Sequence, residues 1–476
     1  MTSILNRFRT SFFAFAAMSA ICASTLLPSV TAGQTNYVFV DDDAPAGGDG
    51  VRWATAYNNL SVALRNGPRD AVFLVAHGTY RPSPTGISIV DATFNLGPNQ
   101  SLIGGYLGNE TAPFRPMGTP GRTILDGDVQ DSGQPSRYAR HVVTVNTGRP
   151  GRALISRVRI TNGNANGPTR VNKLGGGILF LSRIVPPGRG NTLDVTETIL
   201  EGNVAESFGG GICAIGGTLN MDQCFVEGNG ARELGGGVYL GRSGAGFHDD
   251  GRPERNSHIY NVLFKRNAAA TGGGMAVGTA QDDTRARHLY MNCIFDSNGA
   301  LDNGGGLFLG DWARTSLANS TFSRNVAVND SGGGLYLALG HQRARTTIAN
   351  CISWGNRAPV HPEMAIENVA CGDIPALVAY NNLAHRVLGT GFIPACGGIE
   401  LANFYLDPLF SNPHSGGVRP GPGSPSIDAG REALGNPDYF DADNDGDRTE
   451  LIPVDFAGQP RVSGGTIDQG AVETRN

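Results

Sequence analysis

Arginine residues that could bind an anionic polymer recur at one position in successive segments of the chain. Arg287, Arg314 and Arg345 each lie eleven residues before an asparagine, and Arg255 lies one place out of this register in the preceding segment. The surrounding loops add one aromatic and five acidic side chains: Trp312, Asp249, Asp250, Asp282, Asp283 and Asp311. Guanidinium groups bind carboxylates and sulfates through paired hydrogen bonds, and an aromatic ring suits the face of a sugar. The spacing therefore predicts a face that holds an acidic polysaccharide. The alternative is a solvated surface column neutralised by its own aspartates.

A second group of side chains has the spacing of a calcium loop. Four carboxylates alternate along the chain: Asp441, Asp443, Asp445 and Asp447. Oxygen ligands at alternate positions, with a glycine such as Gly446 at the sharp turn, describe the start of such a loop. The twelfth position of an EF-hand, normally a bidentate glutamate, is here Ile452, although Glu450 lies close by. The segment predicts a weak calcium site, with a plain acidic turn as the alternative.

The elements that must position these groups form a repeat. Triple glycines begin at residues 175, 209, 235, 272, 304 and 332, in steps of 34, 26, 37, 32 and 28 residues. A period of this size is typical of a solenoid, a propeller or an array. Each unit also carries an asparagine at a corresponding place: Asn203, Asn229, Asn267, Asn298, Asn325 and Asn356. The uneven steps indicate a fixed structural unit with loops of variable length.

Columns of like residues appear when the units are aligned on these asparagines. An apolar column lies eight residues before them, a polar column six before, and mainly apolar or small columns five and three before. Because side chains alternate within a strand, the shift of the apolar positions requires a bend at the polar column, where asparagine tolerates a left-handed backbone. Each repeat is expected to contain two or three short strands, paired in parallel between repeats. Phe264, Phe295 and Phe322 are then expected to stack inside, about 5 Å apart.

The glycines fit tight corners between these strands, because glycine adopts a positive φ and lets backbones approach closely. A phosphate-binding loop would need a helix directly after the glycines, whereas GGGVYL and GGGLFL are typical of strands. A helical solenoid would need amphipathic stretches of about ten or more residues, which the units lack. The sequence therefore predicts an all-β protein with a right-handed parallel β-helix, a propeller-like module being the more distant alternative.

The combination of Gly-Gly-Gly-apolar with Phe-x-x-Asn resembles a known repeat. The second motif is complete at three places: Phe264 to Asn267, Phe295 to Asn298 and Phe322 to Asn325. The unit resembles the repeat of chlamydial polymorphic outer-membrane proteins and, more broadly, secreted bacterial β-helix proteins of the pectate-lyase-like kind. The resemblance covers residues 155–357. It implies a right-handed parallel β-helix and says little about activity.

Catalysis on an acidic polysaccharide is the alternative to binding alone. A β-helix lyase needs a base, commonly a lysine or arginine with a lowered pKa or one assisted by calcium, and the chain has only two lysines, Lys173 and Lys265. The β-helix hydrolases of known families carry Gly-His-Gly and Arg-x-Lys, and neither occurs in this sequence. We expect a protein that binds glycan or cell-surface matrix without catalysis, with a polysaccharide lyase or hydrolase as the alternative.

Segments on both sides of the repeats are expected to complete the solenoid. A helix over residues 53–65 is predicted because four apolar side chains share one face: Trp53, Tyr57, Leu60 and Leu64. It would cap the first coil within an N-terminal region of residues 33–130, since repeat proteins must cover the apolar end of the stack. The repeats occupy residues 131–357. Residues 358–476 are expected to form irregular closing coils that include the calcium loop.

The N-terminus and the composition indicate an exported protein. Arg7 and Arg9 precede an apolar run over residues 12–27, and small residues up to Ala32 offer a cleavage site, so residues 1–32 read as a secretory signal peptide. A retained N-terminal anchor is the alternative. A net charge of −5 gives no basic excess for nucleic acid. No later segment has the ~20 apolar residues of a membrane span. The expected location is the medium, the cell surface or the periplasm.

Six of the seven cysteines lie beyond the expected signal peptide. Cys371 and Cys396 flank one irregular segment and are the candidate disulfide pair, because an exported chain permits disulfides. Cys224, Cys293 and Cys351 occupy one repeat position instead. These three are predicted to fill the core as small apolar side chains.

Overall fold

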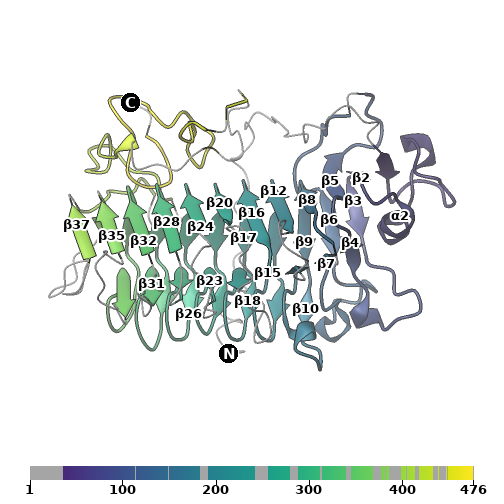
Figure 1. Ribbon diagram of the computed structural model, residues 1–476, viewed down its shortest axis with the longest axis horizontal. Helices are drawn as coiled ribbons and strands as arrows, with labels where there is room; N and C mark the ends of the chain where they lie inside the picture. Colours follow the sequence, from purple (N-terminus) through teal and green to yellow (C-terminus); the bar gives the residue numbers. More distant parts are fainter. Residues whose placement is uncertain are drawn as a thin grey trace. The chain divides into compact units, whose positions relative to one another are not determined.

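The computed structural model describes residues 36–474, except 113, 148, 183–190, 242–255, 279–287, 311–313, 339–344, 368–376, 381, 385–397, 402, 404, 413–416, 433–437, 439–445 and 448. The chain divides into two compact units, Leu27–Arg255 and Asn256–Asn476. Each unit contains strands of four parallel sheets, which we name A to D, and successive coils add one strand to each sheet in turn (Figure 1). This arrangement confirms the predicted right-handed parallel β-helix.

The strands of the first unit, in their spatial order, are as follows. Sheet A contains β1 (Tyr37–Val40), β2 (Val72–Ala76), β5 (Ser101–Tyr106), β8 (Arg152–Ser156), β12 (Thr192–Thr196) and β16 (Thr218–Asp222). Sheet B contains β3 (Gly78–Tyr80), β6 (Thr123–Asp126), β9 (Val158–Thr161), β13 (Ile199–Glu201) and β17 (Phe225–Glu227). Sheet C contains β4 (Phe94–Leu96), β7 (Val143–Thr147), β11 (Ile178–Ser182), β15 (Ile212–Ile215) and β19 (Val238–Gly241). Sheet D contains β10 (Asn164–Ala165), β14 (Val204–Ala205) and β18 (Gly230–Ala231).

The second unit repeats this plan. Its sheet A contains β20 (His258–Tyr260), β24 (His288–Met291), β28 (Arg314–Ala318), β32 (Arg345–Ala349), β35 (Leu377–Tyr380) and β37 (Gly398–Leu401). Sheet B contains β21 (Leu263–Lys265), β25 (Ile294–Asp296), β29 (Thr321–Ser323), β33 (Ile352–Trp354) and β36 (Leu383–Ala384). Sheet C contains β23 (Met275–Val277), β27 (Leu307–Leu309), β31 (Leu335–Ala338) and β34 (Met364–Glu367), and sheet D contains β22 (Ala268–Ala269), β26 (Gly299–Ala300) and β30 (Val326–Ala327).

A complete coil contains four strands, where the sequence led us to expect two or three. The additional strands are the two-residue elements of sheet D, which lie between the ladder asparagine and the triple glycine. Elements this short carry no alternating pattern of side chains, and so they could not be distinguished from a turn in the sequence.

The bend that joins sheet A to sheet B is the one predicted at the polar column. Every residue of that column has a positive φ: 46° at Glu197, 50° at Gln223, 51° at Asn261, 52° at Asn292, 47° at Asn319 and 52° at Asn350. These values lie in the left-handed region, which asparagine tolerates better than most residues. The side chains also bond along the column, since Asn350 Nδ2 donates to Asn319 Oδ1 over 3.0 Å.

A second asparagine column forms a hydrogen-bonded ladder between the coils. Asn298 Nδ2 donates to Asn325 Oδ1 and to the carbonyl oxygen of Phe264, both at 2.9 Å. Asn325 Nδ2 donates to Asn356 Oδ1 at 2.9 Å. These side chains are buried, so each one satisfies backbone groups that the turn would otherwise leave without a partner.

Three phenylalanines stack inside the second unit, as predicted. The ring centroids of Phe264 and Phe295, and those of Phe295 and Phe322, are 4.7 Å apart, with interplanar angles of 4° and 1°. Phe264 and Phe295 are fully buried. The spacing equals that of neighbouring strands, because each ring occupies the same position in successive coils.

The triple glycines form a corner at which backbones of successive coils touch. The first glycine of each cluster has a positive φ, for example 67° at Gly304. At the second position, a Cβ added to Gly305 would lie 2.4 Å from the carbonyl oxygen of Gly333. No side chain fits there, which explains why the glycines recur in each coil.

The cysteine column fills the core as predicted. Cys224, Cys293 and Cys351 are buried thiols, and burial raises the pKa of the Cys351 thiol to about 12. Such thiols are unreactive, because the thiolate form is disfavoured. Cys371 and Cys396, the candidate disulfide pair, lie outside the described residues.

The N-terminal cap differs from the single helix expected over residues 53–65. The structure has a short 3₁₀ helix η1 (Trp53–Thr55) and a separate helix α2 (Leu60–Asn66), which contacts β4 and β1. The side chain of Asn59 accepts a hydrogen bond from Val62 N and starts α2 there. Three further 3₁₀ helices occur: η2 (Ile89–Asp91), η3 (Pro135–Arg137) and η4 (Val171–Lys173).

The irregular C-terminal segment packs along the side of the second unit. The coils continue through β34 to β37, up to Leu401. The described residues from 405 to 474, which we call the strap, then lie beside the strands of the same unit (yellow in Figure 1). Phe410 and Val472 of the strap pack in one buried cluster with Ile294 and Ile352, whose side chains point out of sheet B.

Candidate functional site

The predicted arginine column begins two neighbouring strands of sheet A. Arg314 is the first residue of β28 and Arg345 the first of β32, and the two are register partners. Thr315 and Leu317 are buried inside the coil, so Arg314 occupies an outward position. Its side chain is half-buried. Since parallel neighbours lie about 4.8 Å apart, the two backbone positions are adjacent.

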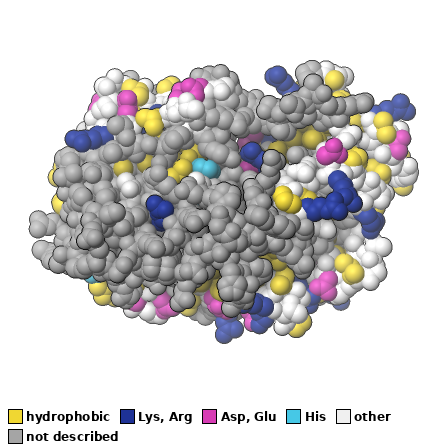
Figure 2. All heavy atoms as spheres, viewed as in Figure 1, with side chains coloured by type: hydrophobic (Ala, Val, Ile, Leu, Met, Phe, Trp, Pro, Cys, Tyr) yellow, Lys and Arg dark blue, Asp and Glu magenta, His cyan; other side chains and the backbone are white. Residues whose placement is uncertain are grey.

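The other members of the predicted face lie outside the described residues: Arg255, Arg287, Trp312, Asp249, Asp250, Asp282, Asp283 and Asp311. Strand β24 begins at His288, directly after Arg287 in the sequence, and His288 is the register partner of Thr315. The strand register therefore agrees with the eleven-residue spacing from which the column was predicted. On the face seen in Figure 2, the described basic side chains are interspersed with acidic ones.

Of the predicted calcium loop, the structure describes Gly446 and Asp447. Gly446 has a φ of 91°. Asp447 is exposed, and its Oδ1 accepts hydrogen bonds from the backbone N and the Oγ1 of Thr449, at 2.8 and 2.7 Å. These bonds lower the pKa of Asp447. Asp441, Asp443 and Asp445 lie outside the described residues, and the calcium site stays a prediction.

We expect residues 441–447 to bind Ca²⁺ with millimolar affinity. Replacement of Asp443 and Asp445 by alanine removes two of the predicted ligands and should abolish the binding heat in titration calorimetry. Asp407→Ala, which removes an exposed carboxylate elsewhere in the strap, is the matched control and should bind as the parent does. Equal heats for the parent and the double variant would show that no ion binds at this loop.

Each of the two lysines lies beside an acidic residue. Lys173 Nζ forms an ion pair with Glu206 Oε1 over 3.1 Å. Lys265 is half-buried on β21, opposite Asp296 in the strand register.

A row of paired charges on the outward face of the first unit was not predicted. Arg152 Nε contacts Asp194 Oδ2, and Asn220 Nδ2 donates to Asp194 Oδ1 over 2.9 Å. At the adjoining bend Arg157 pairs with Glu197, where burial raises the pKa of the Glu197 carboxyl and the guanidinium opposes this. These side chains satisfy one another between successive coils. The pairs link one coil to the next. Glu197 belongs to the polar column of the repeat alignment, which was the signal in the sequence for its pair.

Three consecutive aspartates at the start of the first unit also come together. One carboxylate oxygen of each of Asp41, Asp42 and Asp43 lies within 4.8 Å of the others, the only such group of three that the described residues contain. Asp42 Oδ2 already accepts a hydrogen bond from Thr79 N over 2.9 Å. Burial raises the pKa of Asp41 and Asp42. The arrangement is that of an acidic turn next to β3.

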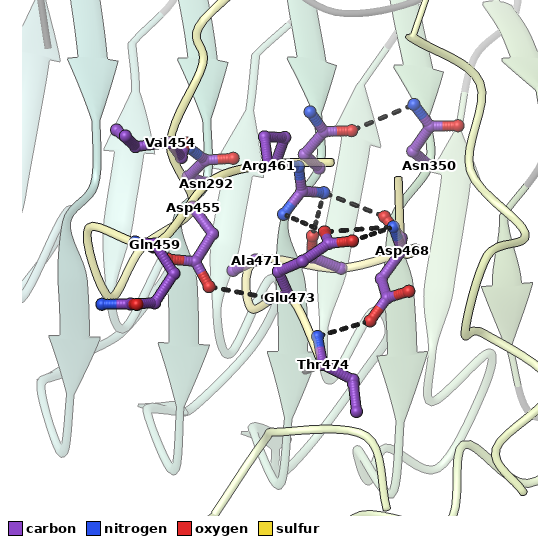
Figure 3. A network of polar contacts seen from close by, with 12 residues as sticks. Asn292, Asn350, Val454, Asp455, Gln459, Arg461, Asp468, Ala471, Glu473 and Thr474 are labelled. Carbon is purple, nitrogen blue, oxygen red and sulfur yellow. Dashed lines mark hydrogen bonds and ion pairs between the residues drawn. The ribbon is translucent and has the colours of Figure 1, made fainter. Parts of the chain in front are cut away.

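The strap contains a buried network of charged side chains, shown in Figure 3. Arg461 Nη2 donates to the carbonyl oxygens of Asp468 and Gly470, at 2.9 and 2.7 Å, and its Nη1 lies 3.8 Å from Glu473 Oε2. Asp455 and Asp468 are buried beside them. The sequence signal was available in DFAGQPR and IDQGAVE, where charged residues stand among small and apolar ones.

The network is attached directly to the coils. Ala471 N donates to Thr321 Oγ1 over 3.0 Å, and Gly470 N donates to the carbonyl oxygen of Asn350 over 2.7 Å. The Asn350 side chain exchanges two hydrogen bonds with the backbone of Arg431, at 2.9 and 3.0 Å. The strap therefore uses the asparagine bends of the coils as its attachment points.

Several solved structures resemble the chain. Pectate lyase Pel9A is 13% identical, with coverage of 93% of this chain and 97% of the other and a TM-score of 0.43. The surface adhesin PfbA of Streptococcus pneumoniae is 11% identical (73% and 79% coverage, TM-score 0.35). The A-module of the Azotobacter vinelandii mannuronan C-5 epimerase AlgE4 is 12% identical (77% and 95%, TM-score 0.32). No protein-family model matches the chain, and no curated protein does either.

Among the described residues, none of the helices has the length and apolarity needed to cross a membrane.

Proposed function

We propose that the chain is an exported protein of the cell surface or the extracellular space, which binds an acidic glycan or a matrix containing one without catalysing its cleavage. The observation that carries the proposal is the register pairing of Arg314 with Arg345, the first residues of the neighbouring strands β28 and β32. Cations repeated at the strand spacing form a row, and a row of cations suits a polymer with repeated carboxylates or sulfates.

The chemistry of the described residues favours binding over cleavage. Lys173 is held by Glu206, and the buried cysteines are unreactive. On the outward side of the first unit, Asp194 is paired with Arg152 and Glu197 with Arg157. Export is supported by the N-terminal sequence, in which a basic stretch precedes an apolar run and small residues.

The proposal predicts binding of polygalacturonate, alginate or heparin that weakens with salt, because ions screen charge interactions between exposed groups. The variant Arg287→Ala/Arg314→Ala/Arg345→Ala should bind at least about tenfold more weakly, since each charge-assisted hydrogen bond contributes about 1.5 to 3 kcal/mol. Titration calorimetry at low salt and at about 0.5 M NaCl measures both effects.

The matched control is Arg65→Ala/Arg69→Ala, which removes exposed arginines elsewhere and should leave the affinity unchanged. Equal affinity of the triple variant and the parent, or no binding by the parent to any of the three polymers at low salt, would contradict the proposal. Formation of unsaturated uronates or reducing ends during these titrations would instead establish the lyase or hydrolase alternative.

A further inference from the structure

The strap buries more negative than positive charge. The side chain of Arg461 is 4% exposed and that of Glu473 1% exposed, and Asp455 and Asp468 are buried with them. One guanidinium and three carboxylates, all ionised, would leave a net charge of −2 inside the protein. Burying uncompensated charge is costly, and a buried carboxyl group avoids the cost by binding a proton.

Glu473 is the carboxylate that is least stabilised as an anion. Asp455 accepts hydrogen bonds from three backbone amides: those of Ala457, Gln459 and Glu473. Asp468 accepts from two, those of Asp428 and Thr474. Among the residues that the structure describes, one backbone amide donates to Glu473, that of Asp468. Because hydrogen bonds to a carboxylate favour its charged form, the anion of Glu473 receives the least support of this kind.

The direction of the pKa shift of Glu473 agrees with this difference in hydrogen bonding. Burial raises the pKa of Glu473 to about 7, although Arg461 opposes the shift and Asp468 and Asp455 add to it. Burial lowers the pKa of Arg461, while the three carboxylates and the thiol of Cys351, from the coils below, raise it. Within the described part of the chain, these are the charged and titratable groups around Glu473 and Arg461 from the strap and from the coils.

The charge on Glu473 is coupled to the docking of the strap on the coils, because the buried charged network of the strap lies directly against them. Ala471, two residues before Glu473, is bonded to Thr321. A Cβ added to Gly470 would lie 2.8 Å from Thr321 Oγ1, so the strap backbone rests directly on sheet B. A change in the packing around Glu473 therefore changes the contact with β29 and β33.

We propose that the strap is a pH-responsive latch, docked most firmly when Glu473 carries a proton and loosened when Glu473 ionises. Loosening exposes the outward column of sheet B formed by Ile294, Thr321 and Ile352. The latch uses only residues of the strap and of the coils that it covers, and it is independent of the arginine face.

The direction of the effect follows from proton linkage. The pKa of Glu473 is about 7 in the folded protein and 4.5 for an unperturbed glutamate. A raised pKa stabilises docking fully below about pH 4.5, and this contribution is lost as the pH rises through about 7. We expect protection of the strap amides to fall about tenfold to a hundredfold between about pH 5 and pH 8.

Hydrogen–deuterium exchange of the full chain at several pH values tests the latch, after correction for the intrinsic pH dependence of exchange. The amides of Gly470 and Ala471 should lose protection progressively between about pH 4.5 and pH 7, while those of β23 and β27 keep theirs. Glu473→Gln imitates the protonated side chain, and its strap should stay protected at both ends of the range.

Glu363→Gln is the matched control, because burial raises the pKa of Glu363 to about 7 as well, and Glu363 lies at the end of the asparagine ladder, where Asn356 bonds to it. This variant should keep the pH dependence of the strap. A parent without pH-dependent protection, a Glu473→Gln variant that retains it, or its loss in Glu363→Gln would overturn the latch. If Glu473→Gln does not fold, the pH dependence of strap protection in the parent and in Glu363→Gln still tests the latch.

Discussion

Replacement of Phe295 by alanine is expected to lower the free energy of unfolding of the second unit by about 3 to 5 kcal/mol. Phe295 lies between Phe264 and Phe322, 4.7 Å from each ring, and is fully buried. Its removal takes away apolar area and leaves a cavity that the stacked neighbours cannot close, because hydrogen-bonded strands hold their spacing. Chemical denaturation monitored by circular dichroism measures the loss.

Two comparisons make this prediction specific to the stack. Phe308→Ala removes a ring of the same size from a half-buried outward position on β27 and should cost less. The protein itself contains a truncated position one coil beyond Phe322, where Ser353 lines a cavity of about 20 Å³. A loss below about 1 kcal/mol for Phe295→Ala would contradict a core role for the stack.

Replacement of Arg461 by methionine is expected to cost about 3 to 5 kcal/mol at neutral pH, the usual penalty for removing one partner of a buried ion pair. The substitution leaves Asp455, Asp468 and Glu473 buried without a cation. The loss should be smaller at about pH 5, because Glu473 can then bind a proton. Thermal or chemical unfolding at the two pH values measures both quantities, and an equal loss at both would contradict the charge argument.

A double-mutant cycle that combines Arg461→Met with Glu473→Gln isolates the interaction energy between Arg461 and Glu473. The combined variant Arg461→Met/Glu473→Gln should lose less stability than the two single losses added together, because the second change removes one of the charges that the first leaves uncompensated. Lys173→Met, which breaks the partly exposed pair with Glu206, is the control. It should cost no more than about 1 kcal/mol.

The repeat could be predicted from the sequence because each of its rules is local. The left-handed bend at Asn319 and the inward stacking of Phe295 follow from side-chain alternation and from the spacing to one asparagine. The same spacing placed Arg314 and Arg345 side by side. Strand register is thus readable wherever like residues recur at a fixed distance.

Features that depend on contacts distant in the sequence could not be predicted in this way. The docking of the strap joins Ala471 to Thr321, 150 residues apart, and no local pattern specifies that contact. A signal was nevertheless present, because Ile294 and Ile352 are apolar at outward positions and therefore need a cover. The expected helix over residues 53–65 was wrong in its extent because apolar periodicity ignores the cap at Asn59.

The division of each coil into fixed and variable parts has a consequence for how such a chain can change over generations. At the triple glycine the backbone lies too close to the carbonyl oxygens of the next coil to admit a Cβ, and the asparagine ladder joins coil to coil. An insertion at either place would therefore break contacts in two neighbouring coils at once. The connection from a strand of sheet C to the next strand of sheet A varies in length. It has two residues between β15 and β16 and sixteen between β19 and β20. Codons can be gained or lost at this junction without cost to the stack. The predicted arginine loops arise at this junction, so their sequences can diversify while the scaffold is inherited unchanged.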